Sequence, residues 1–211
     1  MKLSIVIPSF NVGETIGGIV SELKKSHYVH EIIVVDNNSS DNTGEVAKQN
    51  GATVITCSNQ GLGFAVKAGI EKSECDFIMK IDGDIYNPNS QWINRLVKGM
   101  TQKIVYISGI YNSSYDEYPV GNLVAKPALK LRHPYLDYVV RPLSGTYLFN
   151  KNMVNVTELP DNWAFDLSLL IKSHHISGII GQVEIGMLND KQKQISEYKK
   201  MAFELLQFLF D

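Results

Sequence analysis

The chain has 211 residues, of which 44% are hydrophobic and 20% are charged, and its formal net charge is −2. This length suits one domain, and the composition is typical of a globular protein. The nearly neutral charge provides no basic surface for nucleic acid, and Cys57 and Cys75 form no C-x-x-C pair that would indicate a zinc site or a disulfide framework.

The first apolar run is short, is interrupted by Pro8, and is followed by no small-residue cleavage site. It therefore predicts a first strand and not a signal peptide. No apolar run approaches the ~20 residues that a membrane-spanning helix needs. We expect a cytoplasmic protein with one domain, 1–211, made of a nucleotide-sugar-binding half (1–100), an acceptor-binding half (101–189) and a C-terminal helix (190–211).

Strands and helices alternate through the first half of the chain. Continuous apolar runs predict strands at 3–9, 31–36, 52–57 and 76–82, and helical spacing of apolar residues predicts helices at 13–25, 41–49 and 63–71. This alternation indicates an α/β fold, with an open, twisted, mostly parallel sheet and helices on both faces. Ligands of such sheets bind at the carboxyl ends of the strands, where this chain carries its polar clusters.

The second half is less regular. It predicts a helix at 92–100, a strand at 103–111, a polar loop at 112–122, a stretch with three prolines and several basic residues at 126–143, a strand at 145–150, a helix at 162–175, a strand at 178–188 and a long helix at 190–210.

Two carboxylates separated by one glycine, Asp82-Gly83-Asp84, follow the fourth predicted strand. A turn alone would account for these residue types, but their position at a strand tip favours a ligand site. The sequence has neither a G-x-G-x-x-G after its first strand nor a G-x-x-x-x-G-K-[ST] loop to hold phosphate. Because Mg²⁺ and Mn²⁺ prefer carboxylate and phosphate oxygens, the acidic pair predicts a nucleotide diphosphate bridged by a metal.

Four segments in order, SIVIPSFNVGETI, EIIVVDNNSSDNT, GLGFAVKAGI and DFIMKIDGDIYNP, resemble the nucleotide-sugar-dependent glycosyltransferases of the GT-A fold, family 2-like. Those begin I-P-x-x-N, continue V-V-D-x-x-S-x-D-x-T and place D-x-D after the fourth strand. The segments LVAKPAL, RPLSGTYLF, FDLSLLI and IIGQVEIGML resemble blocks of the glucosyl-3-phosphoglycerate synthase type, which retains anomeric configuration. The resemblance implies a Rossmann-like nucleotide-binding half, a nucleotide-diphospho-sugar donor and Mn²⁺ or Mg²⁺ as cofactor.

The resemblance implies donor contacts in the loops after the strands. They fall on Pro8, Ser9 and Asn11 for the nucleoside, Asp36 and Asn37 for the nucleobase, and Gly61, Asp82, Gly83 and Gly145 along the nucleotide sugar. An alternative is that Asn11 caps the following helix and Asn37 stabilises its own turn. Ser39, Asp41 and Thr43 are expected to be turn and cap residues.

Three positions depart from the pattern of these glycosyltransferases. Val12 stands where they often carry a glutamate that contacts the ribose, and Leu62 stands near a position where they carry a lysine or arginine. Lys67, one helical turn further on, is expected on a solvated face. Asp190 aligns with a histidine that ligates the metal; it is either a replacement ligand or the cap of the final helix.

The resemblance implies that Asp84 ligates the metal directly and that Asp82 contacts the ribose or positions the metal, with Asp190 at the place of a third ligand. Leu143, beside Gly145, aligns with residues that line the donor sugar near its reacting carbon. Asp166 matches an acid on the acceptor side, which acts as general base in inverting enzymes and holds the sugar or acceptor in retaining ones. An exposed helix acid is the alternative. His174 and His175 face apart on a helix and are expected to be structural.

The acceptor is the least defined part of the predicted site. An Arg-x-Thr that grips phosphoglycerate in the resembling enzymes is replaced by Pro119 and Gly121. Cationic side chains at Lys126, Arg132 and Arg141 are candidates for an anionic acceptor, and Tyr111, Tyr115 and Tyr118 for stacking on a sugar. Phosphoglycerate, a glycan precursor and a lipid phosphate all remain open.

The sequence therefore predicts a metal-dependent hexosyltransferase that moves glucose from UDP-glucose to a small anionic or glycan acceptor, with retention. Two alternatives remain: a polyprenyl-phosphate sugar synthase, and a non-catalytic protein that binds nucleotide sugars.

The C-terminal helix carries two adjacent apolar stripes, formed by Tyr198, Ala202, Leu205 and Leu209 and by Phe203, Leu206 and Phe210. The domain can cover one face, so the other predicts an interface, which we assign to a homodimer. Peripheral membrane contact is the alternative, because Lys191, Lys193, Lys199 and Lys200 lie near the start of the helix.

Overall fold

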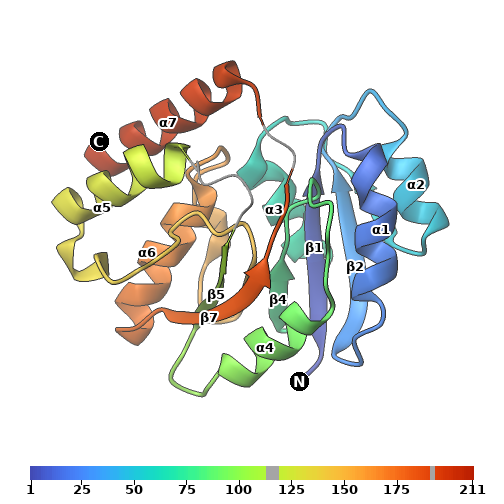
Figure 1. The fold of residues 1–211 in the computed structure, drawn as a ribbon, viewed down its shortest axis with the longest axis horizontal. Helices are drawn as coiled ribbons and strands as arrows, with labels where there is room; N and C mark the ends of the chain where they lie inside the picture. Colours follow the sequence, from blue (N-terminus) through green and yellow to red (C-terminus); the bar gives the residue numbers. More distant parts are fainter. Residues whose placement is uncertain (113–118, 191–192) are drawn as a thin grey trace.

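The computed structural model describes residues 1–112, 119–190 and 193–211. Within them lies a seven-stranded sheet in the order β3-β2-β1-β4-β6-β5-β7 (Figure 1). Its strands are β1 (Leu3–Ser9), β2 (Val29–Asp36), β3 (Thr53–Thr56), β4 (Phe77–Lys80), β5 (Tyr106–Asn112), β6 (Tyr147–Asn150) and β7 (Gly181–Met187). Strands β1 to β4 are parallel, β6 is antiparallel to β4 and β5, and β7 is parallel to β5. The mostly parallel α/β sheet predicted from the sequence is confirmed.

Strand β1 is the centre of the parallel part, because it pairs with β2 on one side and β4 on the other. Leu3, Ile5 and Ile7 point into one hydrophobic core and Val6 points into the other. A strand covered on both faces must be apolar at successive positions, which explains the uninterrupted run that opens the sequence.

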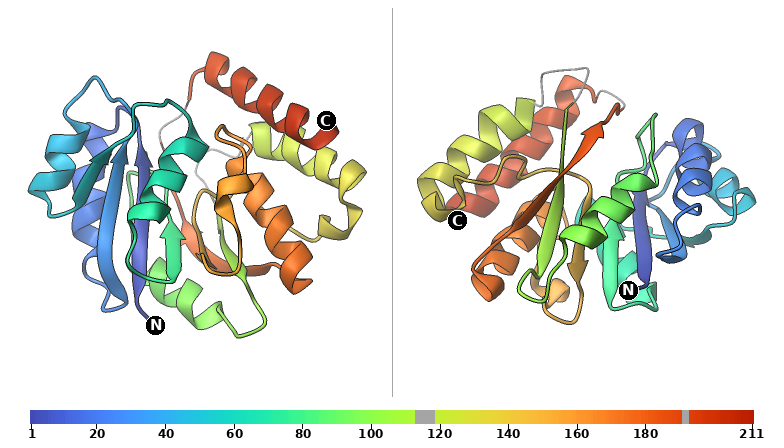
Figure 2. Two further views of the ribbon diagram at one scale, coloured as in Figure 1. Left: turned by 180° about the vertical axis from the view of Figure 1, so that it is seen from behind. Right: turned by 60° about the horizontal axis from the view of Figure 1, so that its bottom comes forward.

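Helices cover both faces of the sheet (Figure 2). One face carries α1 (Gly13–Leu23), α2 (Thr43–Gln49) and α4 (Gln91–Gly99); the other carries α3 (Leu62–Lys72) and α6 (Phe165–Ser177), with α5 (Lys126–Arg132) and α7 (Ile195–Phe210) beside them. Among the described residues, no helix is long and apolar enough to cross a membrane.

Two parts of the second half differ from the sequence prediction. The proline-containing stretch is partly helical: a π-helical turn, Gly121–Ala125, leads directly into α5, and Pro127 lies in its first turn, where an N–H has no intrahelical partner to lose. The final helix begins at Ile195 and not at position 190, because Gln194 and Glu197 form a capping box at its start.

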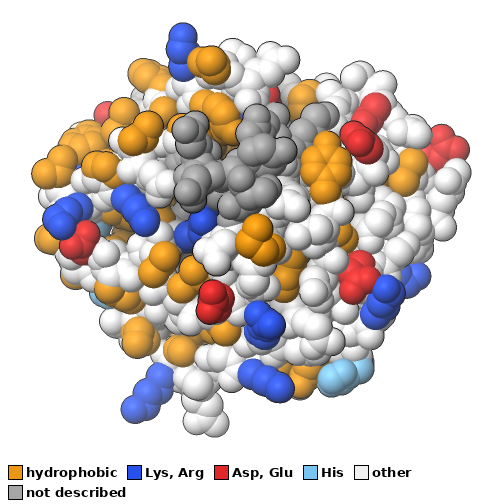
Figure 3. All heavy atoms as spheres, in the orientation of Figure 1, with side chains coloured by type: hydrophobic (Ala, Val, Ile, Leu, Met, Phe, Trp, Pro, Cys, Tyr) orange, Lys and Arg blue, Asp and Glu red, His pale blue; other side chains and the backbone are white. Residues whose placement is uncertain are grey.

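Helix α7 uses its two apolar stripes differently. Leu205 and Leu209 are buried in the core, with Tyr198 and Ala202 packed against it. Phe203, Leu206 and Phe210 remain 67%, 41% and 50% exposed, and hydrophobic side chains gather over α5 and α7 on the molecular surface (Figure 3). One covered stripe and one uncovered stripe are what the sequence predicts.

Replacing Leu205 by Ala should lower the free energy of unfolding by about 2–5 kcal/mol, because it leaves a cavity in the core. Phe203→Ala, two positions away on the exposed stripe, is the matched control and should change it by less than about 0.5 kcal/mol. Urea unfolding of dilute protein measures both. An equal loss of unfolding free energy in the two variants would contradict the orientation of α7.

Candidate active site

A cavity lies at the carboxyl ends of the parallel strands, between the two halves of the chain. Its lining includes Lys80, Asp82, Lys126, Arg141, Asp166 and Asp190. Acids and bases therefore share one pocket. Leu143 and Gly145, predicted to line the donor sugar, are also part of its wall.

The turn Asp82-Gly83-Asp84 packs directly against the end of β1. A Cβ atom at Gly83 would lie 2.9 Å from Ser9 Oγ and 3.3 Å from the Pro8 carbonyl oxygen, so only glycine allows this approach. The hydroxyl of Thr15 donates a 2.6 Å hydrogen bond to the Gly83 carbonyl. The glycine between the two acids is thus explained by packing, and it fixes both carboxylates at the strand tip.

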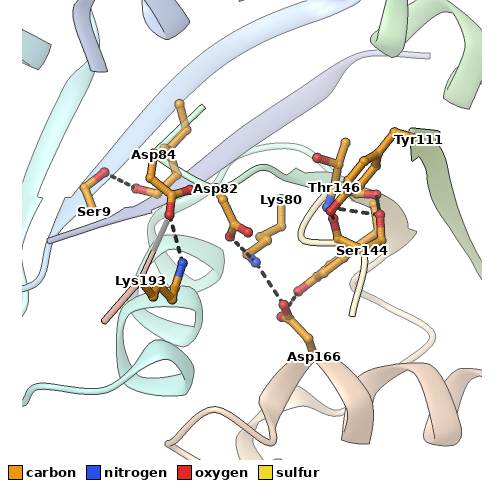
Figure 4. Close-up of polar contacts among 11 residues, drawn as sticks. Ser9, Lys80, Asp82, Asp84, Tyr111, Ser144, Thr146, Asp166 and Lys193 are labelled. Carbon is orange, nitrogen blue, oxygen red and sulfur yellow. Dashed lines mark hydrogen bonds and ion pairs between the residues drawn. The ribbon is translucent and has the colours of Figure 1, made fainter. Parts of the chain in front are cut away.

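Lys80, the last residue of β4, is buried in the middle of the site and was missed by the sequence prediction. Its ammonium donates to Asp82 Oδ1 at 2.6 Å and to Asp166 Oδ2 at 2.9 Å (Figure 4). Burial alone would lower the pKa of Lys80, but the charges of Asp166 and Asp82 outweigh it and raise that pKa above its usual value. Lys80 therefore remains charged and joins the two acids. The available signal was a lysine inside an apolar strand, FIMKID.

Asp166 lies in the first turn of α6 and is only 6% exposed, so the exposed helix acid considered above is wrong. Its second oxygen, Oδ1, accepts a 2.7 Å hydrogen bond from the hydroxyl of Tyr147. Burial and the charge of Asp166 raise the pKa of Tyr147, which keeps that hydroxyl a donor. Both oxygens of Asp166 are engaged, an arrangement that suits orientation of a ligand better than removal of its proton.

Asp84 and Asp190 are brought together by chain segments far apart in sequence. Ile85 forms an antiparallel bridge with Asp190, and Tyr86 N donates to Asn189 O at 2.8 Å. Burial, followed by the charge of Asp84, raises the pKa of Asp190 to about 6. Gln194 caps α7, so the alternative prediction, that Asp190 is the helix cap, is wrong.

The two carboxylates fit a divalent metal that also binds a substrate phosphate. Mg²⁺ is commonly held by one or two carboxylates together with phosphate oxygens and water. Carboxylate oxygens of this kind are available from Asp84 and Asp190, which makes the two side chains candidate ligands; Asp82 is held by the buried Lys80. No group of three or more His, Cys, Asp or Glu side chains within 1–112, 119–190 and 193–211 could hold a metal ion by itself.

Asn37, at the end of β2, holds the loop after β3. Its amide nitrogen donates to the carbonyls of Cys57 and Asn59 at 3.0 and 2.7 Å, and its oxygen accepts from Gly61 N at 2.9 Å. These contacts stabilise the loop after β3, whereas the alternative expected Asn37 to stabilise its own turn. Its neighbour Asp36 accepts from Ser39 N at 3.0 Å and is partly exposed.

Asn11 does not cap α1, whose cap position is Val12. The first N–H groups of α1 are instead bound by the neighbouring loop: Val12 N donates to Thr43 Oγ1 at 2.9 Å, and Gly13 N donates to Asp41 Oδ2 at 3.0 Å. The expected structural roles of Asp41 and Thr43 agree with these bonds. Asn11 has φ +52° and accepts from Ser40 N at 2.8 Å, so it shapes the loop after β1.

The segment before β6 approaches the acidic turn closely. Gly145 has φ +68°, and a Cβ there would lie 2.1 Å from Asp82 Oδ2. The hydroxyl of Tyr111 donates to Ser144 O at 2.9 Å, and the Arg141 guanidinium lies 4.4 Å from the Tyr111 ring centroid. Tyr111 lines the cavity but is only 4% exposed, and the contacts that the structure shows are those that support Arg141 and the backbone at Ser144.

Two cations are located away from their expected surroundings. Lys67 is not on a solvated face: its ammonium donates to Asp161 Oδ1 at 2.7 Å and to Leu159 O, joining α3 to that loop. Arg132 does not line the cavity, since its Nε donates to Leu209 O at 2.9 Å and so ties α5 to α7.

Other predicted residues take structural positions or fall outside the described part of the chain. His174 stacks on Tyr135 with ring centroids 4.9 Å apart, and the Tyr135 hydroxyl lies 2.7 Å from His175 Nε2. Tyr115, Tyr118 and Lys191 lie outside the described residues.

A mostly parallel sheet that ends in a D-x-D turn beside a mixed-charge cavity defines a nucleotide-sugar glycosyltransferase of the GT-A fold. Residues 4–156 match the model of glycosyl transferase family 2, and the chain belongs to this family.

Glucosyl-3-phosphoglycerate synthases are among its relatives. That of Mycolicibacterium smegmatis is 25% identical over 97% of this chain and 75% of its own length, and that of Petrotoga mobilis is 28% identical over 97% and 71%. The Mycobacterium tuberculosis synthase in complex with Mn²⁺, UDP-glucose and phosphoglyceric acid has a TM-score of 0.91 and 26% identity, covering 99% of this chain and 78% of that one. The same synthase has also been crystallised with Mg²⁺ and UDP, with a TM-score of 0.90.

Replacing Lys80 by Met should lower the free energy of unfolding by about 3–5 kcal/mol at neutral pH, because the charge of Asp166 is then buried without its partner. The loss should shrink toward acid pH, where protonation of the carboxylates removes the unpaired charge. In the wild type the pKa of Lys80 is raised. The contribution of its ion pairs to the free energy of unfolding is therefore fully present below a pH of about 10.4, the usual lysine pKa, and is lost only as the pH rises above that value.

Urea unfolding at acid and neutral pH measures this difference. Lys72→Met, at the exposed end of α3, is the control and should stay within about 0.5 kcal/mol of the wild type. A Lys80→Met protein as stable as the wild type at neutral pH would contradict the network.

Proposed function

We propose that this glycosyltransferase is a metal-dependent hexosyltransferase that transfers glucose from UDP-glucose to a small anionic acceptor, with retention. The observation that carries the proposal is one cavity whose wall holds both acids, among them Asp82 and Asp190, and cations, among them Lys126 and Arg141. A metal-bound diphosphate suits the acids, and an anionic acceptor suits the cations. The names of the relatives and the contents of their crystal structures support the same pair of substrates.

The donor end requires a divalent ion, because a diphosphate beside bare aspartates would be repelled. We assign Mn²⁺ or Mg²⁺ to Asp84 and Asp190; when bound, it neutralises charge on the leaving diphosphate. We assign the nucleobase to the vicinity of Asp36, since the amide of Asn37 is engaged with the protein. Pro8, Ser9 and the loop at Asn11 then form the nucleoside wall through their backbone shape.

The part of the cavity near the sugar carbon contains groups that would orient the substrates and would not transfer protons. Asp166, held by Lys80 and Tyr147, presents a fixed carboxylate to hydroxyls of the sugar or acceptor. Leu143 and Gly145 complete the wall near the reacting carbon. Because both oxygens of Asp166 are engaged, the departing diphosphate oxygen is the group that would take the proton of the acceptor hydroxyl, which favours attack on the face of the leaving group, and hence retention.

The acceptor is assigned by charge. Lys126 and Arg141 lie in the cavity wall, and Arg141 is held over Tyr111. Phosphoglycerate, which the tuberculosis synthase contains, is the first compound to test. Pro119 and Gly121 supply no side-chain donors, so phosphoglycerate should bind this chain more weakly than an acceptor with further contacts.

We also propose a cytoplasmic homodimer that buries the exposed stripe of α7. Phe203, Leu206 and Phe210 provide the apolar surface. Light scattering of the full chain, alone and with anionic vesicles, separates a dimer from a monomer that adsorbs to membranes. A monomer bound to vesicles would instead favour the polyprenyl-phosphate sugar synthase.

Replacing Asp84 by Ala should abolish Mn²⁺-dependent UDP-glucose binding and leave the fold intact, because the side chain lies at a strand tip. Calorimetric titration with UDP-glucose and Mn²⁺ measures binding, and release of UDP measures turnover. Asp76→Ala, an exposed acid at the opposite end of β4, is the matched control and should bind normally. Wild-type UDP release by Asp84→Ala would refute the metal assignment, whereas donor binding without UDP release by the wild type would support the non-catalytic alternative.

The affinity for Mn²⁺ should fall as the pH drops below about 6, by up to about tenfold per unit, because the ion must displace a proton from Asp190. Asp190→Asn should bind Mn²⁺ more weakly at neutral pH and lose this part of the pH dependence. Asp190→His should retain or strengthen binding, since imidazole also ligates Mn²⁺. Equal Mn²⁺ affinity in all three proteins would remove Asp190 from the site.

A further inference from the structure

Lys193 lies two residues before α7, and its ammonium points at the acidic turn after β4 (Figure 4). The distance from Lys193 Nζ to Asp84 Oδ2 is 2.9 Å. Both side chains are largely covered, with 24% of Lys193 and 16% of Asp84 exposed. The backbone N–H of Lys193 donates to the Tyr198 hydroxyl at 3.3 Å, which fixes the residue against the first turn of α7.

The acids of the site are divided between two lysines. Lys80 binds Asp82 and Asp166, at the floor of the cavity. The remaining pair, Asp84 and Asp190, faces Lys193: its ammonium contacts Asp84 and counters the effect of Asp84 on Asp190. Lys193 is therefore the protein's own counter-charge for the two carboxylates that we assign to the metal.

An ammonium and a divalent ion are not compatible neighbours on this carboxylate pair. A Mg²⁺ ion ligated by Asp84 would lie about 2.0–2.1 Å from a carboxylate oxygen. The ammonium contacts the same carboxylate at 2.9 Å, so two positive charges would share one small, partly buried space. Their repulsion is strengthened by the low local dielectric. Binding of the ion thus requires the ammonium to move.

We propose that Lys193 acts as an internal cation that occupies the metal site, and that Mn²⁺ or Mg²⁺ binds by displacing its ammonium from Asp84. The inference rests on the proposed function, because it assumes that Asp84 and Asp190 hold the metal. The inference adds to the proposed function that Lys193 lowers the affinity of the site for the metal. The consequence is that the acidic pair is neutralised in the absence of metal, and that metal loading is coupled to the start of α7.

The test measures Mn²⁺ binding to the full chain without nucleotide, by the electron paramagnetic resonance signal of free Mn²⁺. Lys193→Gln should bind Mn²⁺ at least tenfold more tightly than the wild type, because the competing charge is gone. Lys193→Arg keeps the charge and should bind as weakly as the wild type. Lys199→Gln, an exposed lysine on α7, is the matched control and should remain within twofold.

The same titrations with Asp84→Ala separate this inference from the proposed function. Unchanged or weaker Mn²⁺ binding by Lys193→Gln, with binding lost in Asp84→Ala, would overturn the inference alone. Mn²⁺ binding that survives Asp84→Ala would overturn the metal assignment itself. Should Lys193→Gln fail to fold, tight binding by Lys193→Arg would overturn the inference and weak binding would support it.

Discussion

The ion pairs of Lys80 are the interaction on which the site depends. One buried ammonium joins Asp82, at the tip of a central parallel strand, to Asp166, at the start of a helix in the second half of the chain. Without it, two carboxylates would face each other across a cavity wall, and each would have to be neutralised or moved into water. The network therefore has two effects: it holds the turn after β4 against the start of α6, and it makes an acidic cavity compatible with a stable fold.

Charge balance follows from the same constraint. Four aspartates lie in or beside the cavity, at positions 82, 84, 166 and 190, and Lys80 and Lys193 contribute two positive charges to them. The excess of negative charge is what a divalent ion can match. Lys126 and Arg141 also lie in the cavity wall and add positive charge to it. A wall with both signs of charge is compatible with the metal-bound donor and the anionic acceptor that we propose.

The sequence predicts those features that depend on local pattern. The strands at 3–9 and 31–36 are recognisable because burial on both faces makes them apolar throughout, and the D-x-D turn is recognisable because it follows such a strand. Contacts between distant segments leave no comparable pattern. Lys193 lies 109 positions from Asp84, and the bridge from Ile85 to Asp190 joins residues with no shared motif. The sequence shows Lys80 only as a lysine in an otherwise apolar strand. That pattern does not predict which carboxylates the lysine binds.

Polar loop residues illustrate a further limit of motif-based prediction. A helix that starts beside the site must satisfy its own first N–H groups before its loop can serve a ligand. In α1 this is done by Asp41 and Thr43 from the neighbouring loop, and Asn37 likewise binds the backbone around Gly61. The residues that resemble a nucleotide-binding motif thus act first on the protein itself. Under the proposed function, recognition of the nucleoside depends on the backbone shape that they maintain. At Val12 it is the backbone N–H that binds Thr43, a contact that does not depend on the side chain at that position.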